Sequence, residues 1–206
     1  QYSLRVCIQR GWPPQNQRVG LNATGFAGGA KGGEVANQTE YTVDSFISEA
    51  KALVAERGVT DESLQSIAQG MKRLVERSDL FQIGQHRGPG ANAAEAYTLY
   101  QDPEPEGPML LLAKFDKITA VHNHGSWGVL CSYQGREQYT QWDRLDDGVD
   151  PGKARLKVVS EREMGHGDTV YWLDVPNDIH RQAPIGGPAW ELIYMGRNAM
   201  NRPREH

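Results

Sequence analysis

The chain has 206 residues, of which 38% are hydrophobic and 23% charged, so it can form one domain with a sizeable core. Its formal net charge of -4 gives no electrostatic reason to expect nucleic acid or an anionic membrane as a partner. No apolar run approaches the roughly 20 residues that span a bilayer, and no secretory leader is visible, although the chain starts at Gln1. Two cysteines, Cys7 and Cys131, are too few for a disulfide scaffold, so we expect a cytoplasmic protein.

Residues 1–41 show no regular hydrophobic period and predict an irregular arm. The glycine-rich run at 25–33 has no strand before it and no Gly-Lys-Ser/Thr after it, so it does not indicate a phosphate loop. We expect the arm to pack across the body of the protein or across a neighbouring copy. A homo-oligomer therefore stays open.

Two helices are expected within residues 42–79. Thr42 and Thr60 are suitable N-caps, and Gly58 is placed to end the first helix. Acidic Asp61 and Glu62 fall in the first turn of the second helix, where the helix dipole favours them. Each helix carries one apolar stripe, formed by Phe46, Ile47, Ala50, Leu53 and Val54 in the first and by Leu64, Ile67, Ala68, Met71, Leu74 and Val75 in the second.

Residues 80–206 predict a β-barrel built from short strands, rich in β-branched and aromatic residues and separated by Gly, Pro and Asp. Eight such strands indicate a mostly β protein of the double-sheet jelly-roll type. The expected strands are Tyr97–Tyr100, Met109–Phe115, Ile118–His122, Trp127–Tyr133, Glu137–Trp142, Leu156–Val159, Thr169–Leu173 and Trp190–Met195.

Two histidines, His122 and His124, are separated by one residue at the end of an expected strand. Alternate residues of a strand share a face, so the two imidazoles should project together into the barrel. Imidazoles fill an apolar interior poorly, which favours a metal-ligand role over a packing role. His180 follows a Gly-Asp strand opening and the turn at Pro176, and it is the expected third ligand.

The other three histidines have simpler interpretations. His166 lies between two glycines, as in an exposed turn, and His206 is the last residue. His86 is expected on the surface, with a contribution to the site as the alternative.

This arrangement resembles the cupin superfamily. The first cupin motif runs Gly, five residues, His-x-His, three or four residues, Glu, six residues, Gly. Here Asp116 replaces the first Gly, Gly128 replaces the Glu, and Gly135 closes the motif. The resemblance implies one cupin domain over residues 1–206, with a three-histidine centre that lacks the usual glutamate.

Within the cupins, the chain resembles the cysteine dioxygenase family of thiol dioxygenases. The matching positions are His122-Asn123-His124, Gly128, Gln134-Gly135, Ile179-His180-Arg181 and Tyr194. This resemblance implies Fe(2+) at the three histidines, and Tyr194 as a catalytic group that hydrogen-bonds the bound oxygen or sulfur. A buried tyrosine with an internal hydrogen bond is the alternative for Tyr194.

Two family features are missing. The Ser-x-His-x-Tyr run has Trp190 and Leu192 in place of Ser and His, and the arginine that follows a Tyr-Thr pair is replaced by Leu99 after Tyr97-Thr98. An amino-acid thiol is then disfavoured as substrate unless Arg87 or another arginine binds its carboxylate.

Several further residues are candidates for the substrate pocket. Trp127 would wall the pocket, Gln134 and Gln141 would line it, and Tyr97 and Arg87 would contact the substrate. For Trp127 a core position is the alternative, and for the two glutamines a surface or sheet position. Asp178 either orients a ligand histidine or caps the turn before it.

The function expected from these residues is oxidation of a small thiol to a sulfinate by O₂. One alternative keeps the three-histidine metal and oxidises or cleaves a carbon substrate such as a diketone or hydroxyketone. Another is a non-enzymatic cupin that binds a small ligand.

Overall fold

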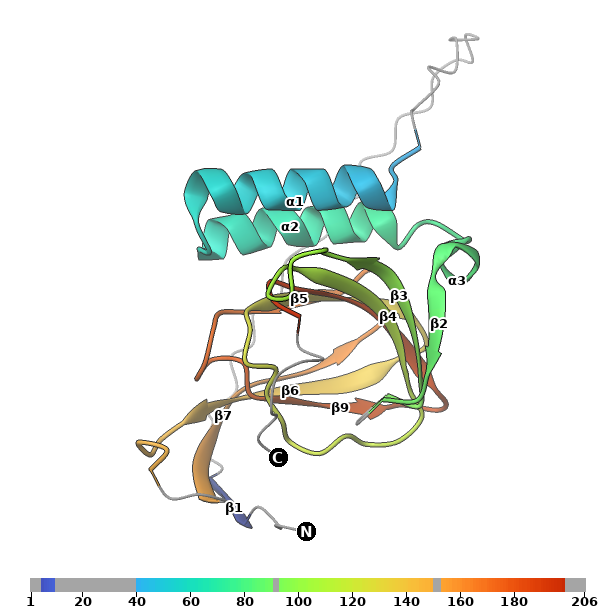
Figure 1. Cartoon of the computed structure of the whole chain (residues 1–206). Coiled ribbons are helices and arrows are strands. Elements are labelled where there is room, and N and C mark those ends of the chain that lie inside the picture. The colour runs from blue at the N-terminus through green and yellow to red at the C-terminus, as the bar shows by residue number, and fades with distance from the viewer. Residues whose placement is uncertain (1–4, 10–39, 91–92, 150–152, 199–206) are drawn as a thin grey trace, which may run out of the picture.

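The computed structural model describes residues 5–9, 40–90, 93–149 and 153–198. Two β-sheets face each other, and a pair of antiparallel helices lies across the outside of one of them (Figure 1). The helices are α1 (Val43–Arg57), α2 (Asp61–Leu74) and the short α3 (Leu80–Ile83). The strands are β1 (Arg5–Gln9), β2 (Gln85–Gly88), β3 (Glu95–Gln101), β4 (Met109–Phe115), β5 (Gly128–Gln134), β6 (Glu137–Arg144), β7 (Lys153–Met164), β8 (Thr169–Trp172), β9 (His180–Pro184) and β10 (Ala189–Met195).

One sheet has the strand order β1-β7-β6-β9 and the other β2-β3-β4-β10-β5-β8. All pairings are antiparallel except that of β1 with β7. The predicted mostly β fold is confirmed, and the two predicted helices precede all strands except β1.

The two helices begin where the sequence predicts. The Thr42 hydroxyl accepts a hydrogen bond from the Ser45 amide, and Thr60 forms a reciprocal capping box with Ser63. Both contacts satisfy amides that the first helical turn leaves without partners. Gly58 ends α1 with a φ of 69°, a conformation that a side chain would strain. No helix in the described ranges is long and apolar enough to cross a membrane.

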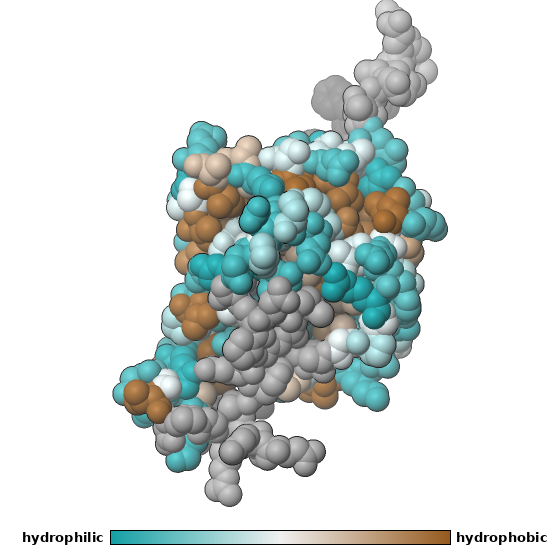
Figure 2. All heavy atoms as spheres, viewed as in Figure 1, coloured by the Kyte–Doolittle hydropathy of each residue, from teal (hydrophilic) through white to brown (hydrophobic). Residues whose placement is uncertain are grey.

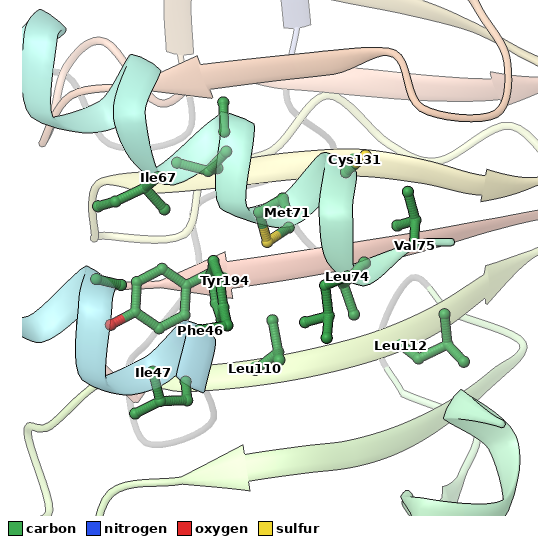
Figure 3. Close-up of a cluster of buried hydrophobic side chains, with 14 of the residues drawn as sticks. Phe46, Ile47, Ile67, Met71, Leu74, Val75, Leu110, Leu112, Cys131 and Tyr194 are labelled. Atoms are coloured by element: carbon green, nitrogen blue, oxygen red, sulfur yellow. The ribbon is translucent and has the colours of Figure 1, made fainter. Parts of the chain in front are cut away.

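Alternation along β4, β5 and β10 assigns their buried apolar side chains to two cores, one on each face of the six-stranded sheet. On β10, Leu192 and Tyr194 face the helices, where they pack with Phe46 and Met71 (Figure 3). Cys131 of β5 lies in the same helix-facing core. We call this the helix-sheet core.

The opposite side chains of the same strands fill the space between the two sheets. Leu111, Leu130 and Ile193 pack there against Tyr139 of β6 and Met164 of β7. We call this space the barrel interior. A shift of one residue in register would exchange the two sets, so the strand pairing decides which groups can reach a site inside the barrel.

Figure 2 shows the distribution of hydrophobic residues on one face of the molecule. On the face seen in Figure 2, hydrophobic residues show in small areas, several of them at the level of the helices, separated by hydrophilic side chains.

The strand assignments from sequence are correct for seven of the eight predicted strands, six of them with shifted ends, and wrong for one. Residues 118–122 form no strand, and His122 makes only an isolated bridge to His180. The short strands β2 and β9 were not predicted, because their polar sequences QHRG and HRQAP lack the apolar alternation of a typical strand. In the predicted irregular arm, residues 5–9 form β1, and residues 10–39 lie outside the described part.

Leu112→Ala should lower the free energy of unfolding by about 2–5 kcal/mol, because it leaves a cavity in the helix-sheet core where Leu112 is fully buried. Chemical denaturation followed by circular dichroism measures this loss. The matched change Leu145→Ala, at an exposed leucine, should alter stability by no more than about 0.5 kcal/mol. Equal effects of the two substitutions would contradict the described packing.

Candidate metal centre

Three histidine side chains converge at one edge of the barrel interior. His122 and His124 come from the irregular segment between β4 and β5, and His180 is the first residue of β9. Their exposed fractions are 3%, 6% and 0%, and one ligand nitrogen from each lies within 4.8 Å of the others. The predicted grouping of these three residues is confirmed.

The ligand segment is held next to β9 by its backbone. The amide of His122 donates to the carbonyl of His180 at 3.0 Å, and the amide of His180 donates back to the carbonyl of His122 at 2.9 Å. Gly125, with a φ of 64°, allows the chain to turn immediately after His124. The expectation that both histidines lie on a regular strand is wrong, because one antiparallel bridge and a turn replace the strand.

Backbone carbonyls set the orientation of two of the rings. The Nδ1 atoms of His122 and His180 lie 2.9 Å from the carbonyl oxygens of Ala120 and Asp178. Each Nδ1–H then donates to its carbonyl, so in the neutral ring the lone pair is on Nε2. Metal-binding histidines in proteins are oriented in the same way.

The spacing of one pair of rings fits a shared ion. The Nε2 atoms of His124 and His180 are 3.2 Å apart. Two imidazole nitrogens that bind one ion at about 2.0–2.1 Å, at angles between octahedral and tetrahedral values, are separated by ~2.8–3.4 Å. The three residues that would hold a divalent metal are therefore His122, His124 and His180.

Two aspartates from the loop before β9 bind the backbone of the segment that carries the ligand histidines. The buried Oδ2 of Asp178 accepts hydrogen bonds from the amides of His124 at 3.0 Å and Gly125 at 2.8 Å. Burial raises the pKa of Asp178, and the two amides oppose that rise. Asp174 accepts from the amide of Trp127 at 2.9 Å and pairs with Arg197. The sequence left open whether Asp178 orients a ligand or caps a turn. Here its carboxylate holds the backbone that carries His124.

Aromatic rings enclose the histidines from the barrel interior. Trp172 stacks on His124 at a centroid distance of 5.7 Å, and Tyr139 stacks on His180 at 5.4 Å, both with an interplanar angle of 21°. Neither residue was predicted as part of the site. Alternation along β6 and β8 was the only available signal, and without the register it could not show which ring reaches a histidine.

The structure places the predicted catalytic Tyr194 and the predicted pocket residue Trp127 in the helix-sheet core. Their rings contact each other at 5.8 Å, and Tyr194 also packs edge-on against Phe46 at 5.2 Å. Burial raises the pKa of the Tyr194 phenol. Both aromatic rings are thus separated from the histidines by the sheet that contains β5 and β10.

The remaining predicted pocket residues also lie away from the histidines. Tyr97 packs on the helix side against Phe81, and Gln134 is exposed at the end of β5. Arg87 donates to Thr98 and Gln101 on the neighbouring strand β3. The structure does not bring any of these predicted pocket residues to the three histidines.

Three weaker candidates are also located. Gln141 shares the face of Tyr139, pairs in register with His180 and donates to the carbonyl of Tyr171 at 3.4 Å. His86 is exposed beside Glu95, and His166 lies in a turn beside Glu76, as predicted. His206 lies outside the described residues.

No protein-family model matches the chain, and no curated protein matches its sequence. Solved cupin-type structures resemble it at low identity. They include oxalate decarboxylase from Bacillus subtilis at pH 4.6 (15% identity, TM-score 0.43, 61% of this chain and 30% of that one) and the DMSP lyase DddQ from Ruegeria pomeroyi (14%, 0.41, 76% and 75%). A cupin 2 conserved barrel domain protein from Rhodopseudomonas palustris has 14% identity and a TM-score of 0.39, over 59% of this chain and 74% of that one.

The chain spans less than half the length of the oxalate enzymes it resembles, 45% of an oxalate oxidase and 30% of the decarboxylase. The fold and the site together therefore describe this molecule as a jelly-roll protein with a buried three-histidine centre. The likeness to the cysteine dioxygenase family rests on sequence motifs alone.

Asp178→Ala should weaken divalent-metal binding by about 10- to 100-fold, because the segment carrying His124 loses both hydrogen bonds to the carboxylate. Competition titration with a chromogenic chelator measures the affinity. Asp143→Ala, at an exposed aspartate of β6, should leave the affinity unchanged. An unchanged affinity in the Asp178 variant would show that the carboxylate does not support the centre.

Proposed function

We propose that this protein is a dioxygenase that holds Fe(2+) at His122, His124 and His180 and oxidises a small thiol to a sulfinate with O₂. The observation that carries the proposal is the convergence of three buried imidazoles in an orientation suited to one divalent ion. Imidazole suits several transition metals, so the choice of iron and thiol is supported by the motif resemblance to the cysteine dioxygenase family.

A bound ferrous ion would supply the redox chemistry that joins both atoms of O₂ to the substrate sulfur. The protein's own residues set the conditions for that chemistry. Three neutral imidazoles leave the dipositive charge uncompensated, which favours an anionic thiolate over a neutral thiol at the centre. The rings of Trp172 and Tyr139 stack on His124 and His180 and would limit the access of water from that side.

The position of Arg87 bears on which substrates the site can bind. Its guanidinium is committed to Thr98 and Gln101 at the edge of the sheet, so it does not provide a carboxylate anchor beside the histidines. A thiol without a carboxylate is therefore our first substrate, and an enolisable ketone, which also binds as an anion, is the second candidate.

His122→Ala should abolish stoichiometric iron binding and oxygen uptake while the circular dichroism spectrum stays unchanged, because one of three ligands is lost. The protein is loaded with iron anaerobically, and an oxygen electrode then screens thiols with and without an amine or carboxylate, alongside enolisable ketones. Mass spectrometry should show a thiol product that has gained two oxygen atoms.

The matched control is His166→Ala, since His166 lies outside the cluster and bonds to the carbonyl of Tyr133. This variant should keep its iron and its activity. Fully loaded wild-type protein that consumes oxygen only with ketones would favour the carbon-substrate alternative. Loaded protein that consumes none with any compound would refute the dioxygenase proposal.

A further inference from the structure

Two carboxyl side chains are buried within the barrel interior. Glu137 begins β6 and Glu191 lies on β10, with exposed fractions of 1% and 0%. The Ser132 hydroxyl donates to Oε1 of Glu137 at 3.3 Å, and the Gln182 amide donates to Oε2 of Glu191 at 3.4 Å. Each carboxyl thus has one oxygen held by a neutral donor.

The other oxygens, Oε2 of Glu137 and Oε1 of Glu191, receive no donor from another side chain or the backbone in the described residues. The two carboxyls are close neighbours, because Ser132, which donates to Glu137, is also the register partner of Glu191 on the adjoining strand. A hydrogen bond between two carboxyl groups requires a proton on one of them. Two ionised carboxylates without a cation would repel each other strongly in this environment.

The charged surroundings of the pair are sparse. In the described ranges neither carboxyl takes part in an ion pair with lysine, arginine or histidine, and the strands around them contribute mainly apolar side chains. Burial is the first cause that raises the pKa of both glutamates. Tyr139 is also buried nearby, and its hydroxyl has no hydrogen-bond partner among the described residues. The charged groups that act on this phenol are Arg162, Asp178 and the two glutamates.

The carboxyl pair lies near the histidine centre, and the two sites are related through β9. Gln182, which donates to Glu191, is two residues from His180 on the same face of β9, a distance of roughly 7 Å along a strand. Tyr139 lies opposite Gln182 in register and stacks on His180. The carboxyl pair and the three imidazoles therefore share one enclosed interior.

We propose that Glu137 and Glu191 share one proton in the barrel interior, and that this buried site releases its proton when a divalent cation binds at the three histidines. A dipositive ion in the same low-dielectric space favours the second negative charge on the pair. Linkage then requires the reciprocal effect, so loss of the shared proton strengthens cation binding. This coupling needs the metal centre but does not need the dioxygenase reaction.

The shared proton is tested first on metal-free protein. Infrared spectroscopy should show the carbonyl stretch of a buried protonated carboxylic acid near neutral pH, shifted in D₂O. Glu191→Gln should remove the band, and Glu161→Gln, at an exposed glutamate of β7, should retain it. A wild-type spectrum without such a band would overturn the proposal, whether or not any variant folds.

The pH dependence of unfolding gives a second measure. The unfolded chain releases this proton near pH 4.3, whereas the folded pair keeps it to a higher pH because its pKa is raised. The stabilisation is therefore fully present below about pH 4.3 and is lost as the pH rises toward the folded pKa. In that range the unfolding constant of the wild type should rise about tenfold per pH unit relative to Glu191→Gln. Parallel curves for the two proteins would count against a shared proton.

Coupling to the metal centre is measured by titration calorimetry with Zn²⁺ in two buffers of different ionisation enthalpy. The wild type should release more protons than Glu191→Gln, by up to about one per metal bound. Equal release would overturn the coupling, and it would leave the infrared result to decide the shared proton. Neither measurement uses turnover, so failure of the proposed dioxygenase activity remains a separate outcome.

Discussion

The close approach of two imidazole nitrogens, Nε2 of His124 and Nε2 of His180 at 3.2 Å, is the constraint on which the site depends. Backbone carbonyls take up Nδ1–H of His122 and His180, which directs lone pairs toward the centre. Lone pairs that face each other in a buried space repel unless a cation or a proton lies between them. The fold accordingly supports this cluster on every side, through the His122–His180 bridge, the Asp178 carboxylate and the stacked rings.

The sheet that carries β5 and β10 separates two environments with different tasks. Its helix-facing side is a conventional apolar core, and Tyr194 and Trp127 belong to it. Its inner side faces the histidines and also holds Glu191. Successive residues of one strand therefore alternate between the apolar core and the side that holds the site. Whether a residue can reach the histidines depends on its face of the strand more than on its distance along the sequence.

The helices could be predicted because their signals are local, and the hydroxyl caps of Thr42 and Thr60 act within three residues. The histidine cluster could be predicted because the His-x-His pair and His180 each lie in a recognisable sequence motif. The surroundings of the site could not be predicted, because they depend on strand register. Glu191 faces inward because it alternates with Leu192 and Tyr194 along β10, but the sequence alone does not show which face of that strand is inside the barrel. Nothing in the sequence EQYTQW marks Glu137 or Tyr139 as interior.

The position of Cys131 has a consequence for the proposed oxygen chemistry. This thiol is fully buried in the helix-sheet core, and burial raises its pKa to about 12. Oxidants attack the thiolate form, which is almost absent at such a pKa. The sheet also separates the sulfur from the three imidazoles. The fold thus keeps this cysteine away from a centre that would oxidise sulfur. The raised pKa and the intervening sheet both protect the thiol from oxidation by the protein's own reaction.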